Sequence, residues 1–267
     1  MNDLSNIFEE YKSKHIVLSL EEERDVISRY VYSTNKLEGN QLTLSQTKSI
    51  IEKGKISGSN LKTQDLLEQR GTYKALIRMI NAVNNKENLT IELIKELNWL
   101  VIGSLFQDDS YLSYKQAGQK YGEFKIKNNL IEVTLKNKQI FQITPLSSPE
   151  NVEINMKMIL TRIKNSETNI SEKASFLAQE LWLNQPFIDG NKRIARLLIN
   201  FLLMKEGYPL FTYEKKGALF NNQLVQQFVD KKPGLIENLI RLQLKNRMKE
   251  LIDSRQINKI SGYRFLI

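Results

Sequence analysis

The stretch QPFIDGNKRIAR, from Gln185 to Arg196, decides how the rest of this sequence is interpreted. It brings one acid, one glycine and three cations together beside an apolar run. Proline cannot continue a helix, so the helix before this stretch is expected to end before Pro186. Helical periodicity resumes after Asn191, with apolar residues at Ile194, Leu197, Leu198, Phe201 and Leu202. The sequence therefore predicts a loop that opens into the first turn of a buried helix.

The first turn of such a helix is suited to bind an anion. Its unpaired backbone N–H groups and the positive end of the helix dipole attract a phosphate. Gly190 lets the backbone approach closely because it has no Cβ, and Lys192 and Arg193 add positive charge. Arg196 lies one turn further on and suits bidentate contact with a terminal phosphate. Asp189 is a poor phosphate ligand but a good ligand for Mg²⁺ held against phosphates.

A second interpretation of these residues stays open. Asp189 is also the kind of acid that a helix N-terminus favours, and the three cations would then lie in solvent. This alternative explains the acid well. It does not explain three cations at the positive end of a dipole, so we favour the phosphate site.

The composition indicates a globular protein. The chain has 267 residues, of which 41% are hydrophobic and 26% charged, which suits one large domain or two small ones. It has no cysteine, which excludes disulfides and thiolate metal sites and favours a reducing compartment. No secretory leader and no apolar run of about 18 residues is visible. We expect a soluble, cytoplasmic protein without a membrane partner.

The formal charge of +9 raises the alternative of a nucleic-acid partner. The excess is mostly lysine, mixed with acids along helical stretches, and neither a basic aromatic strand nor a Cys/His finger is present. Such a pattern is typical of a solvated surface. Nucleic acid is therefore the less favoured partner.

The periodicity predicts an all-α fold with one hairpin. Ser19 and Glu22 form a capping-box pattern at a helix start, and alternation with asparagines between Gly118 and Pro145 indicates a hairpin. Ser148-Pro149 is a helix-start pattern. The sequence predicts eight helices. They are expected from Ser19 to about Lys36, from Ser45 to Lys53, from Leu61 to Val83, from Thr90 onward, from Ser148 to about Lys164, from Ser171 to the quoted loop, from Asn191 to Gly207, and from Pro233 to about Leu251.

The quoted stretch also resembles the signature of the Fic family, His-Pro-Phe-x-Asp/Glu-Gly-Asn-Gly/Lys-Arg-x-x-Arg. The matching positions are Pro186, Phe187, Asp189, Gly190, Asn191, Lys192, Arg193 and Arg196. TNKLEG, from Thr34 to Gly39, is similar to the inhibitory motif of the class with an N-terminal inhibitory helix. The resemblance implies a Fic-type helical bundle with a hairpin flap. It divides the chain into an inhibitory segment (1–60), a core (61–251) with its flap near 124–143, and a basic tail (252–267).

The resemblance implies a nucleotide site that transfers AMP from ATP to a protein hydroxyl of Ser, Thr or Tyr. Asp189 would bind Mg²⁺ and Arg196 the γ-phosphate. The other phosphates would be held by Gly190, Asn191, Lys192 and Arg193. Position 185, Asp189 and Arg193 make up the expected catalytic set.

The resemblance also implies an inhibitor and a docking edge. Glu38 would pair with Arg196 in a partly buried, bidentate contact and misalign ATP, with Thr34 and Gly39 supporting the inhibitory segment. The target strand would dock along the flap. The expected docking residues are Ile131, Val133 and Leu135.

Gln185 departs from the family pattern, which places the catalytic His there as general base. A carboxamide cannot accept a proton near neutral pH, and removing a general base typically slows a reaction about 10²- to 10⁴-fold. The only histidine, His15, lies in the N-terminal lead-in and is expected in solvent. Lys192 is a smaller departure, because glycine is usual there in AMP-transferring members and lysine resembles the phosphate-transferring Doc branch.

Three interpretations follow. The first is a Fic-type protein that binds Mg²⁺ and ATP, is inhibited by Glu38, and is weak or inactive as a transferase because of Gln185. The second is a regulatory protein in which nucleotide occupancy only sets the conformation. The third is a nucleic-acid-associated factor that uses the basic surface. A monomer and a homo-oligomer both stay open.

Overall fold

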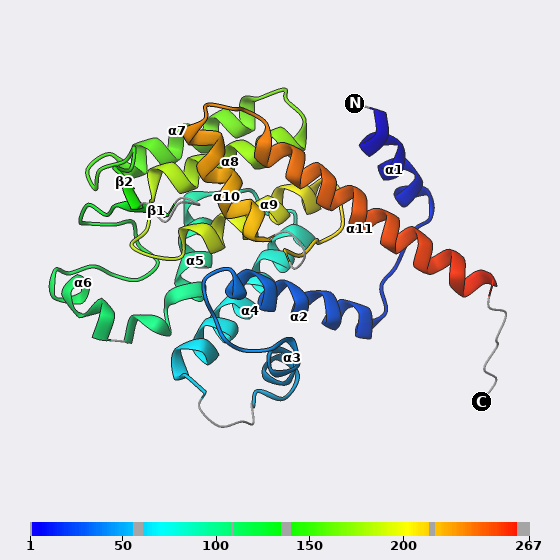
Figure 1. The fold of residues 1–267 in the computed structure, drawn as a ribbon, viewed down its shortest axis with the longest axis horizontal. Coiled ribbons are helices and arrows are strands. Elements are labelled where there is room, and N and C mark those ends of the chain that lie inside the picture. The colour runs from blue at the N-terminus through cyan, green and yellow to red at the C-terminus, as the bar shows by residue number, and fades with distance from the viewer. Residues whose placement is uncertain (1, 56–60, 108, 135–139, 214–216, 261–267) are drawn as a thin grey trace.

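The computed structural model describes residues 2–55, 61–107, 109–134, 140–213 and 217–260, and these residues form a helical bundle with one small hairpin (Figure 1). The predicted all-α class is correct. The α-helices are α1 (Asn2–Ser13), α2 (Leu20–Lys36), α3 (Leu44–Lys53), α4 (Thr63–Asn84), α5 (Ile91–Ile102), α6 (Leu112–Gln116), α7 (Val152–Asn165), α8 (Ile170–Asn184), α9 (Asn191–Lys205), α10 (Gly217–Val229) and α11 (Leu235–Ile260). Two 3-10 helices, η1 (Leu105–Gln107) and η2 (Asp109–Tyr111), precede α6.

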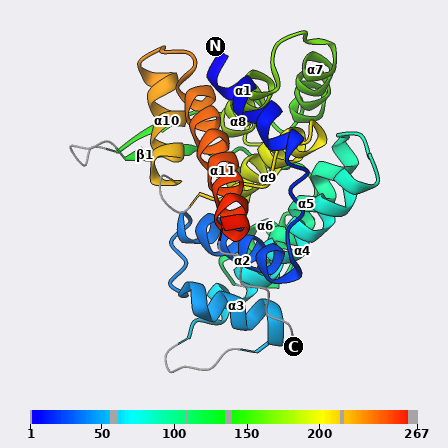
Figure 2. The same ribbon diagram turned by 90° about the vertical axis from the view of Figure 1, so that its right-hand side faces the viewer.

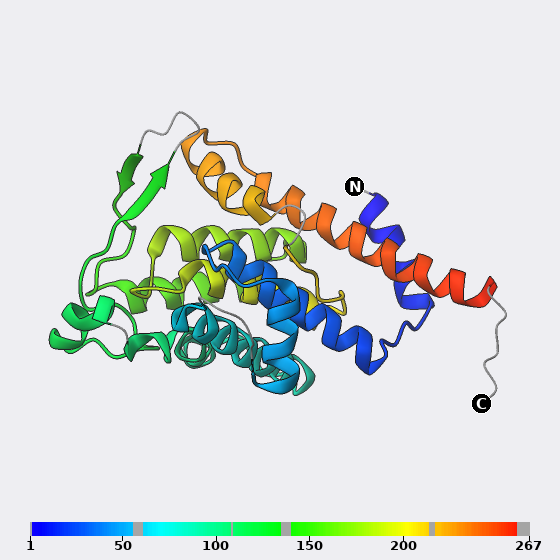
Figure 3. The ribbon, with the colours of Figure 1, turned by 60° about the horizontal axis from the view of Figure 1, so that its bottom comes forward.

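Helix α9, which follows the quoted loop, is the centre of the bundle. Twelve of its fifteen residues are buried, and it packs against α8, α4, α5 and α2. Figure 3 shows it enclosed between these helices. Its apolar residues Ile194, Leu197, Leu198 and Phe201 are all fully buried, and each such side chain stabilises the fold by about 1.5–3 kcal/mol. The prediction of a buried helix after Asn191 is confirmed.

Local signals set several helix ends as predicted. Ser19 and Glu22 form the capping box of α2, and Gly54 ends α3 in the left-handed conformation, with φ of 64°. Thr90 caps α5. The start of α7 differs from the prediction because residues 148–151 form a turn, in which the Ser148 carbonyl accepts from the N–H groups of Asn151 and Val152.

Other elements lie beyond the predicted limits. Helix α8 begins at Ile170, capped by the side chain of Asn169 rather than by Ser171. Helix α11 continues past Leu251 to Ile260, so the expected tail from residue 252 begins inside a helix. Helices α1 and α10 were not predicted. Figure 2 shows α1 lying across α11.

The predicted hairpin is present as strands β1 (Ile131–Thr134) and β2 (Ile140–Ile143). They pair antiparallel, with Ile131 opposite Ile143 and Val133 opposite Phe141. Figure 3 shows the hairpin projecting from the helical body. Leu135, expected at the docking edge, lies outside the described residues.

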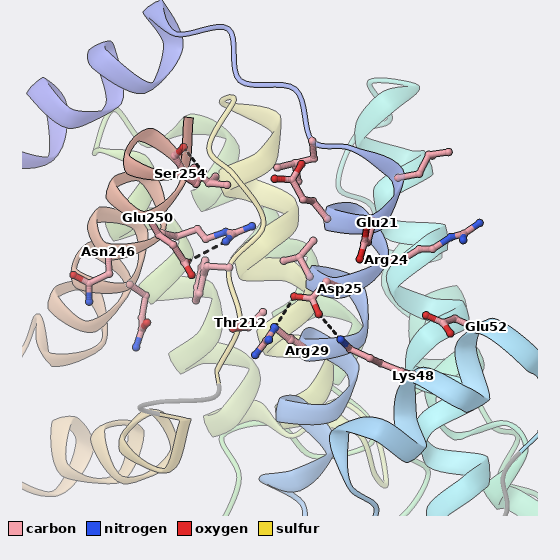
Figure 4. Close-up of a pocket in the computed structure, with 18 residues that line it drawn as sticks. Glu21, Arg24, Asp25, Arg29, Lys48, Glu52, Thr212, Asn246, Glu250 and Ser254 are labelled. Carbon is pink, nitrogen blue, oxygen red and sulfur yellow. Dashed lines mark hydrogen bonds and ion pairs between the residues drawn. The ribbon is translucent and has the colours of Figure 1, made fainter. Parts of the chain in front are cut away.

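A charged cleft of about 1100 Å³ separates α2 and α3 from α11 (Figure 4). Asp25 of α2 lies at its rim and binds Arg29 at 2.6 Å and Lys48 of α3 at 2.5 Å. The Asp25–Lys48 pair ties α3 to the first half of α2. Thr34, in the second half of α2, contacts Arg196 of α9.

No helix within the described ranges is both long enough and apolar enough to cross a membrane.

Candidate active site

The loop from Gln185 to Gly190 is a tight turn between α8 and α9. Gln185 ends α8 in the left-handed conformation, with φ of 43°, and Gly190 precedes α9 with φ of 83°. The Asn191 side chain closes the turn, since its Oδ1 accepts from Phe187 N at 3.0 Å and its Nδ2 donates to Phe187 O at 2.8 Å. Phe187 is fully buried and anchors the loop in the core, as predicted.

The side chain of Gln185 is held at both ends. Its Nε2 donates to Trp182 O at 2.7 Å, and its Oε1 accepts from Asn191 Nδ2 at 2.8 Å. A left-handed conformation at a residue other than glycine is strained by about 1–3 kcal/mol and is typical of functional sites. The two hydrogen bonds fix the orientation of the carboxamide, and the Trp182 contact ties it to the last turn of α8.

Asp189 lies at the mouth of the loop with its side chain 39% exposed. Its Oδ2 accepts from Tyr111 Oη at 2.6 Å and from Arg193 Nη2 at 2.9 Å, and its Oδ1 accepts from Gly190 N at 2.5 Å. Burial acts to raise the pKa of Asp189, but the charge of Arg193 and these hydrogen bonds lower it overall. The carboxylate is therefore ionised at neutral pH.

Gly190 permits a close approach that no other residue would allow. Its left-handed conformation disfavours a side chain, and a Cβ there would lie 2.9 Å from Asn98 Nδ2 and 3.0 Å from Ile102 Cγ2. Asn98 also donates to the Asp189 carbonyl at 2.9 Å. Helix α5 therefore supports the loop from behind.

Two buried arginines stand on the first turns of α9. The side chain of Arg193 is 4% exposed and that of Arg196 is 0% exposed. In each, Nη1 is buried and has no hydrogen-bond partner among the described residues. Buried polar atoms are almost always paired, and a buried arginine pairs best with a carboxylate or phosphate. The two unpaired atoms therefore indicate a site for an anion.

Glu38, just beyond the end of α2, reaches the cations of α9. Its Oε1 lies 2.6 Å from Arg196 Nη2 and its Oε2 lies 2.9 Å from Lys192 Nζ. The expected Glu38–Arg196 pair is present but not bidentate, because the carboxylate is shared between the two cations. Thr34 takes the remaining contacts of Arg196, with Oγ1 accepting from Nε at 2.6 Å and the carbonyl from Nη2 at 3.1 Å.

The pKa of Glu38 has consequences for its charge. Burial acts to raise the pKa of Glu38, but the charges of Arg196, Lys192 and Arg193 lower this pKa to about 2 from an ordinary 4.5. Glu38 is therefore ionised throughout the neutral range. A change in pH near neutrality leaves the pair intact.

We expect this pair to give a pH-dependent stability. A depressed folded-state pKa stabilises the fold above the unfolded value, and the contribution is lost as pH falls. The free energy of unfolding should exceed that of Glu38→Gln by a constant amount from neutral pH to about 4.5, and the gap should narrow toward pH 2. Urea unfolding of both chains against pH measures it. A gap that does not change between neutral pH and pH 3 would contradict the ionised pair.

A buried polar network holds the segment that carries Glu38. Asn35 Nδ2 donates to Gln69 Oε1 at 3.3 Å and its Oδ1 accepts from Thr72 at 3.0 Å. Asn40 donates to Glu68 Oε2 at 2.8 Å and accepts from Gln69 Nε2 at 3.1 Å. Gly39 between them has φ of 93°. The turn after α2 is thereby fixed on α4.

The segment before the hairpin supports the loop from the other side. Lys125 N donates to Pro186 O at 2.9 Å, and Lys125 Nζ donates to Asn184 O at 3.2 Å. Asn129 Nδ2 donates to Phe187 O at 3.2 Å. Burial lowers the pKa of Lys125 to about 8. The segment that carries the flap therefore binds two loop carbonyls and the carbonyl of the last residue of α8.

The structure brings most predicted residues together around one small cavity of about 80 Å³. It is lined by Glu38, Gln185, Ile188, Asp189, Gly190, Asn191, Lys192 and Arg193. Arg196 is not among the lining residues but pairs with Glu38, which is. Ile131 and Val133 lie in the hairpin and His15 is exposed, so none of these three lines the cavity.

Four residues at this site were missed by sequence reasoning: Asn98, Tyr111, Lys125 and Asn129. Each reaches the loop from a segment remote in sequence, and none belongs to a recognisable pattern. Lys125 and Asn98 are buried, which is unusual for their residue types, and burial is not visible in a sequence.

Comparison with known proteins identifies the domain. The Fic/DOC family model matches residues 88–203. The chain is 28% identical to Protein adenylyltransferase fic-1 of Caenorhabditis elegans over 221 residues. It is 27% identical to Protein adenylyltransferase Fic of Nematostella vectensis over 195 residues. These matches cover 79% and 70% of this chain, but only 38% and 39% of the two relatives.

Solved structures agree. A Fic-domain-containing signalling protein from Bacteroides thetaiotaomicron superposes with a TM-score of 0.78 at 25% identity, over 95% of this chain and 97% of that one. Fic-1 from C. elegans superposes with a TM-score of 0.74 at 21% identity, over 94% of this chain and 71% of that one. Residues 88–203 form a Fic/DOC family domain within a Fic-type fold. The division into 1–60, 61–251 and 252–267 stays a prediction.

Proposed function

We propose that this chain is a nucleotide-binding Fic-domain protein of the AMP-transferase type, inhibited by Glu38 and weak or inactive because of Gln185. The observation that carries the proposal is that the buried Nη1 atoms of Arg193 and Arg196, in the first turns of α9, have no hydrogen-bond partner in the described part of the chain. A triphosphate supplies anionic oxygens for both. The similarity to protein adenylyltransferases supports the type of reaction.

The residues of α9 perform the binding. The N–H groups of its first turn and the side chains of Lys192 and Arg193 hold the phosphates, while Arg196 takes the terminal one. Lys192 and Arg196 both contact Glu38 directly. The cavity of about 80 Å³ is also far smaller than the roughly 300 Å³ at which ligand pockets begin. Glu38 must therefore leave before a triphosphate settles productively.

Asp189 fits a magnesium ligand. Mg²⁺ is usually bound by one or two carboxylates together with substrate phosphates and water, and Asp189 is ionised, partly exposed and beside the phosphate cradle. One acceptor direction on its Oδ1 has no donor among the described residues. Bound there, Mg²⁺ would neutralise charge on the phosphates.

Gln185 limits the chemistry. In AMP transfer the target oxygen bonds to the α-phosphorus, pyrophosphate leaves, and the hydroxyl proton must pass to a base. Gln185 can orient a hydroxyl but cannot take that proton. Both ends of its carboxamide are also engaged with Trp182 and Asn191, which favours the second candidate, a regulatory protein that binds nucleotide without transferring AMP.

Nucleotide binding tests the proposal. A charge-assisted hydrogen bond is worth about 1.5–3 kcal/mol, so in the Glu38→Gly background Arg196→Ala should weaken ATP binding about tenfold or more and leave AMP binding nearly unchanged. Calorimetric titration of ATP, ADP and AMP measures this, with Arg193→Ala as the comparison. Equal losses for all three nucleotides would remove the γ-phosphate assignment from Arg196.

A further inference from the structure

Among the residues that the structure describes, the hydrogen bonds on the Asp189 carboxylate leave a single acceptor direction free. An ionised carboxylate offers about four acceptor directions. Tyr111 Oη and Arg193 Nη2 occupy those of Oδ2, and Gly190 N occupies one of Oδ1. The remaining direction on Oδ1 belongs to a side chain that is 39% exposed and lines the small cavity.

Tyr111 is itself held in place by a row of aromatic rings. Its ring packs 5.5 Å from that of Phe106, which packs 5.2 Å from Tyr121, which stacks 6.1 Å from Trp99 of α5. Asn98, the neighbour of Trp99, binds the Asp189 carbonyl. Helix α5 thus fixes both the main chain and, through Tyr111, the carboxylate of Asp189.

The contact from Tyr111 is strong for its type. At 2.6 Å it falls within the range of an O–H donor to an ionised oxygen. The hydroxyl is the donor in this contact, because an ionised carboxylate oxygen can only accept. Without it, the carboxylate would keep only the Arg193 contact on Oδ2 and the Gly190 contact on Oδ1, so one of its three hydrogen bonds would be lost.

We propose that Tyr111 is a positioning residue for a divalent cation at Asp189. Its hydroxyl fixes the carboxylate so that Oδ1 faces the phosphate cradle, where the cation is held jointly by Oδ1 and the nucleotide phosphates. This inference rests on the proposed nucleotide site. Hydrogen-bond partners of metal ligands typically contribute 10- to 100-fold to metal affinity.

The test separates metal binding from nucleotide binding and from folding. ATP affinity is measured by calorimetry with Mn²⁺ and with EDTA, in the Glu38→Gly background that opens the site. Tyr111→Phe keeps the ring and its packing, and Tyr114→Phe, three residues along, is the matched control outside the Asp189 hydrogen-bond set. We expect Tyr111→Phe to weaken ATP binding about tenfold or more with Mn²⁺ and to leave it within about twofold in EDTA.

Each other outcome overturns the inference for a different reason. Equal weakening with and without Mn²⁺ would mean that Tyr111 only supports the fold, and unchanged or tighter binding with Mn²⁺ would mean that it does not orient the carboxylate. Asp189→Asn distinguishes failure of the underlying site. If Asp189→Asn leaves the Mn²⁺ effect intact, the metal assignment fails, and if ATP does not bind even in EDTA, the proposed function fails.

Discussion

We expect the double variant Gln185→His, Glu38→Gly to transfer AMP efficiently, and each single variant and the unmodified chain to transfer little. Glu38→Gly frees Arg196 and Lys192 for the triphosphate but supplies no base. Gln185→His supplies a base but leaves both cations on Glu38. Because both changes act on one step, the gain is strongly non-additive, and a general base is worth about 10²- to 10⁴-fold.

The geometry at position 185 supports the restored base. Gln185 Nε2 donates to Trp182 O, and an imidazole placed there is expected to donate one N–H to the same carbonyl and keep its other nitrogen free to accept a proton. Labelled-ATP transfer to the chain itself or to a protein target measures the four chains. Gln185→Asn with Glu38→Gly is the control, since it changes the side chain without adding a base. Strong transfer by the unmodified chain, or gains that simply multiply, would contradict the account.

We expect Val133→Pro to abolish modification of a protein target in the active double variant and to leave ATP affinity nearly unchanged. Val133 lies in the middle of β1, and an extended target segment adds to an exposed strand through main-chain hydrogen bonds. Proline removes a donor and disturbs its neighbours. Each main-chain hydrogen bond to the target is worth about 0.5–1.5 kcal/mol. If the proline and the disturbed neighbours cost the target three such bonds, target affinity falls on the order of 100-fold.

Val133→Thr is the matched control, because threonine keeps the backbone N–H and favours strands. Target modification and ATP binding are measured side by side for both variants. Lost ATP affinity in Val133→Pro would show that the hairpin supports the nucleotide site rather than the target. That result is physically reasonable, because Lys125 and Asn129, just before β1, bind the loop carbonyls.

The sequence predicted the parts of the site that lie close together along the chain. Proline at 186, glycine at 190 and the apolar periodicity after Asn191 are local signals, and they place the loop and the start of α9 correctly. The Glu38–Arg196 contact was expected only through the resemblance to a family. Its shared form was not, because nothing in the sequence shows that Lys192 reaches the same carboxylate.

The parts that failed depend on packing between distant segments. Asn35 and Asn40 look like surface residues in a sequence, but they are buried because Gln69, Thr72 and Glu68 of α4 satisfy them. Helix α1 is formed on α11, far along the chain. Such contacts have no local pattern.

A crystal structure of the Glu38→Gly chain with ATP and Mg²⁺ tests the proposed phosphate site most directly. We expect the triphosphate at the N-terminus of α9, with a terminal phosphate oxygen on Arg196 Nη1 and another phosphate oxygen on Arg193 Nη1. ATP bound elsewhere, for example in the charged cleft between α2 and α11, with both arginine atoms still unpaired, would contradict it.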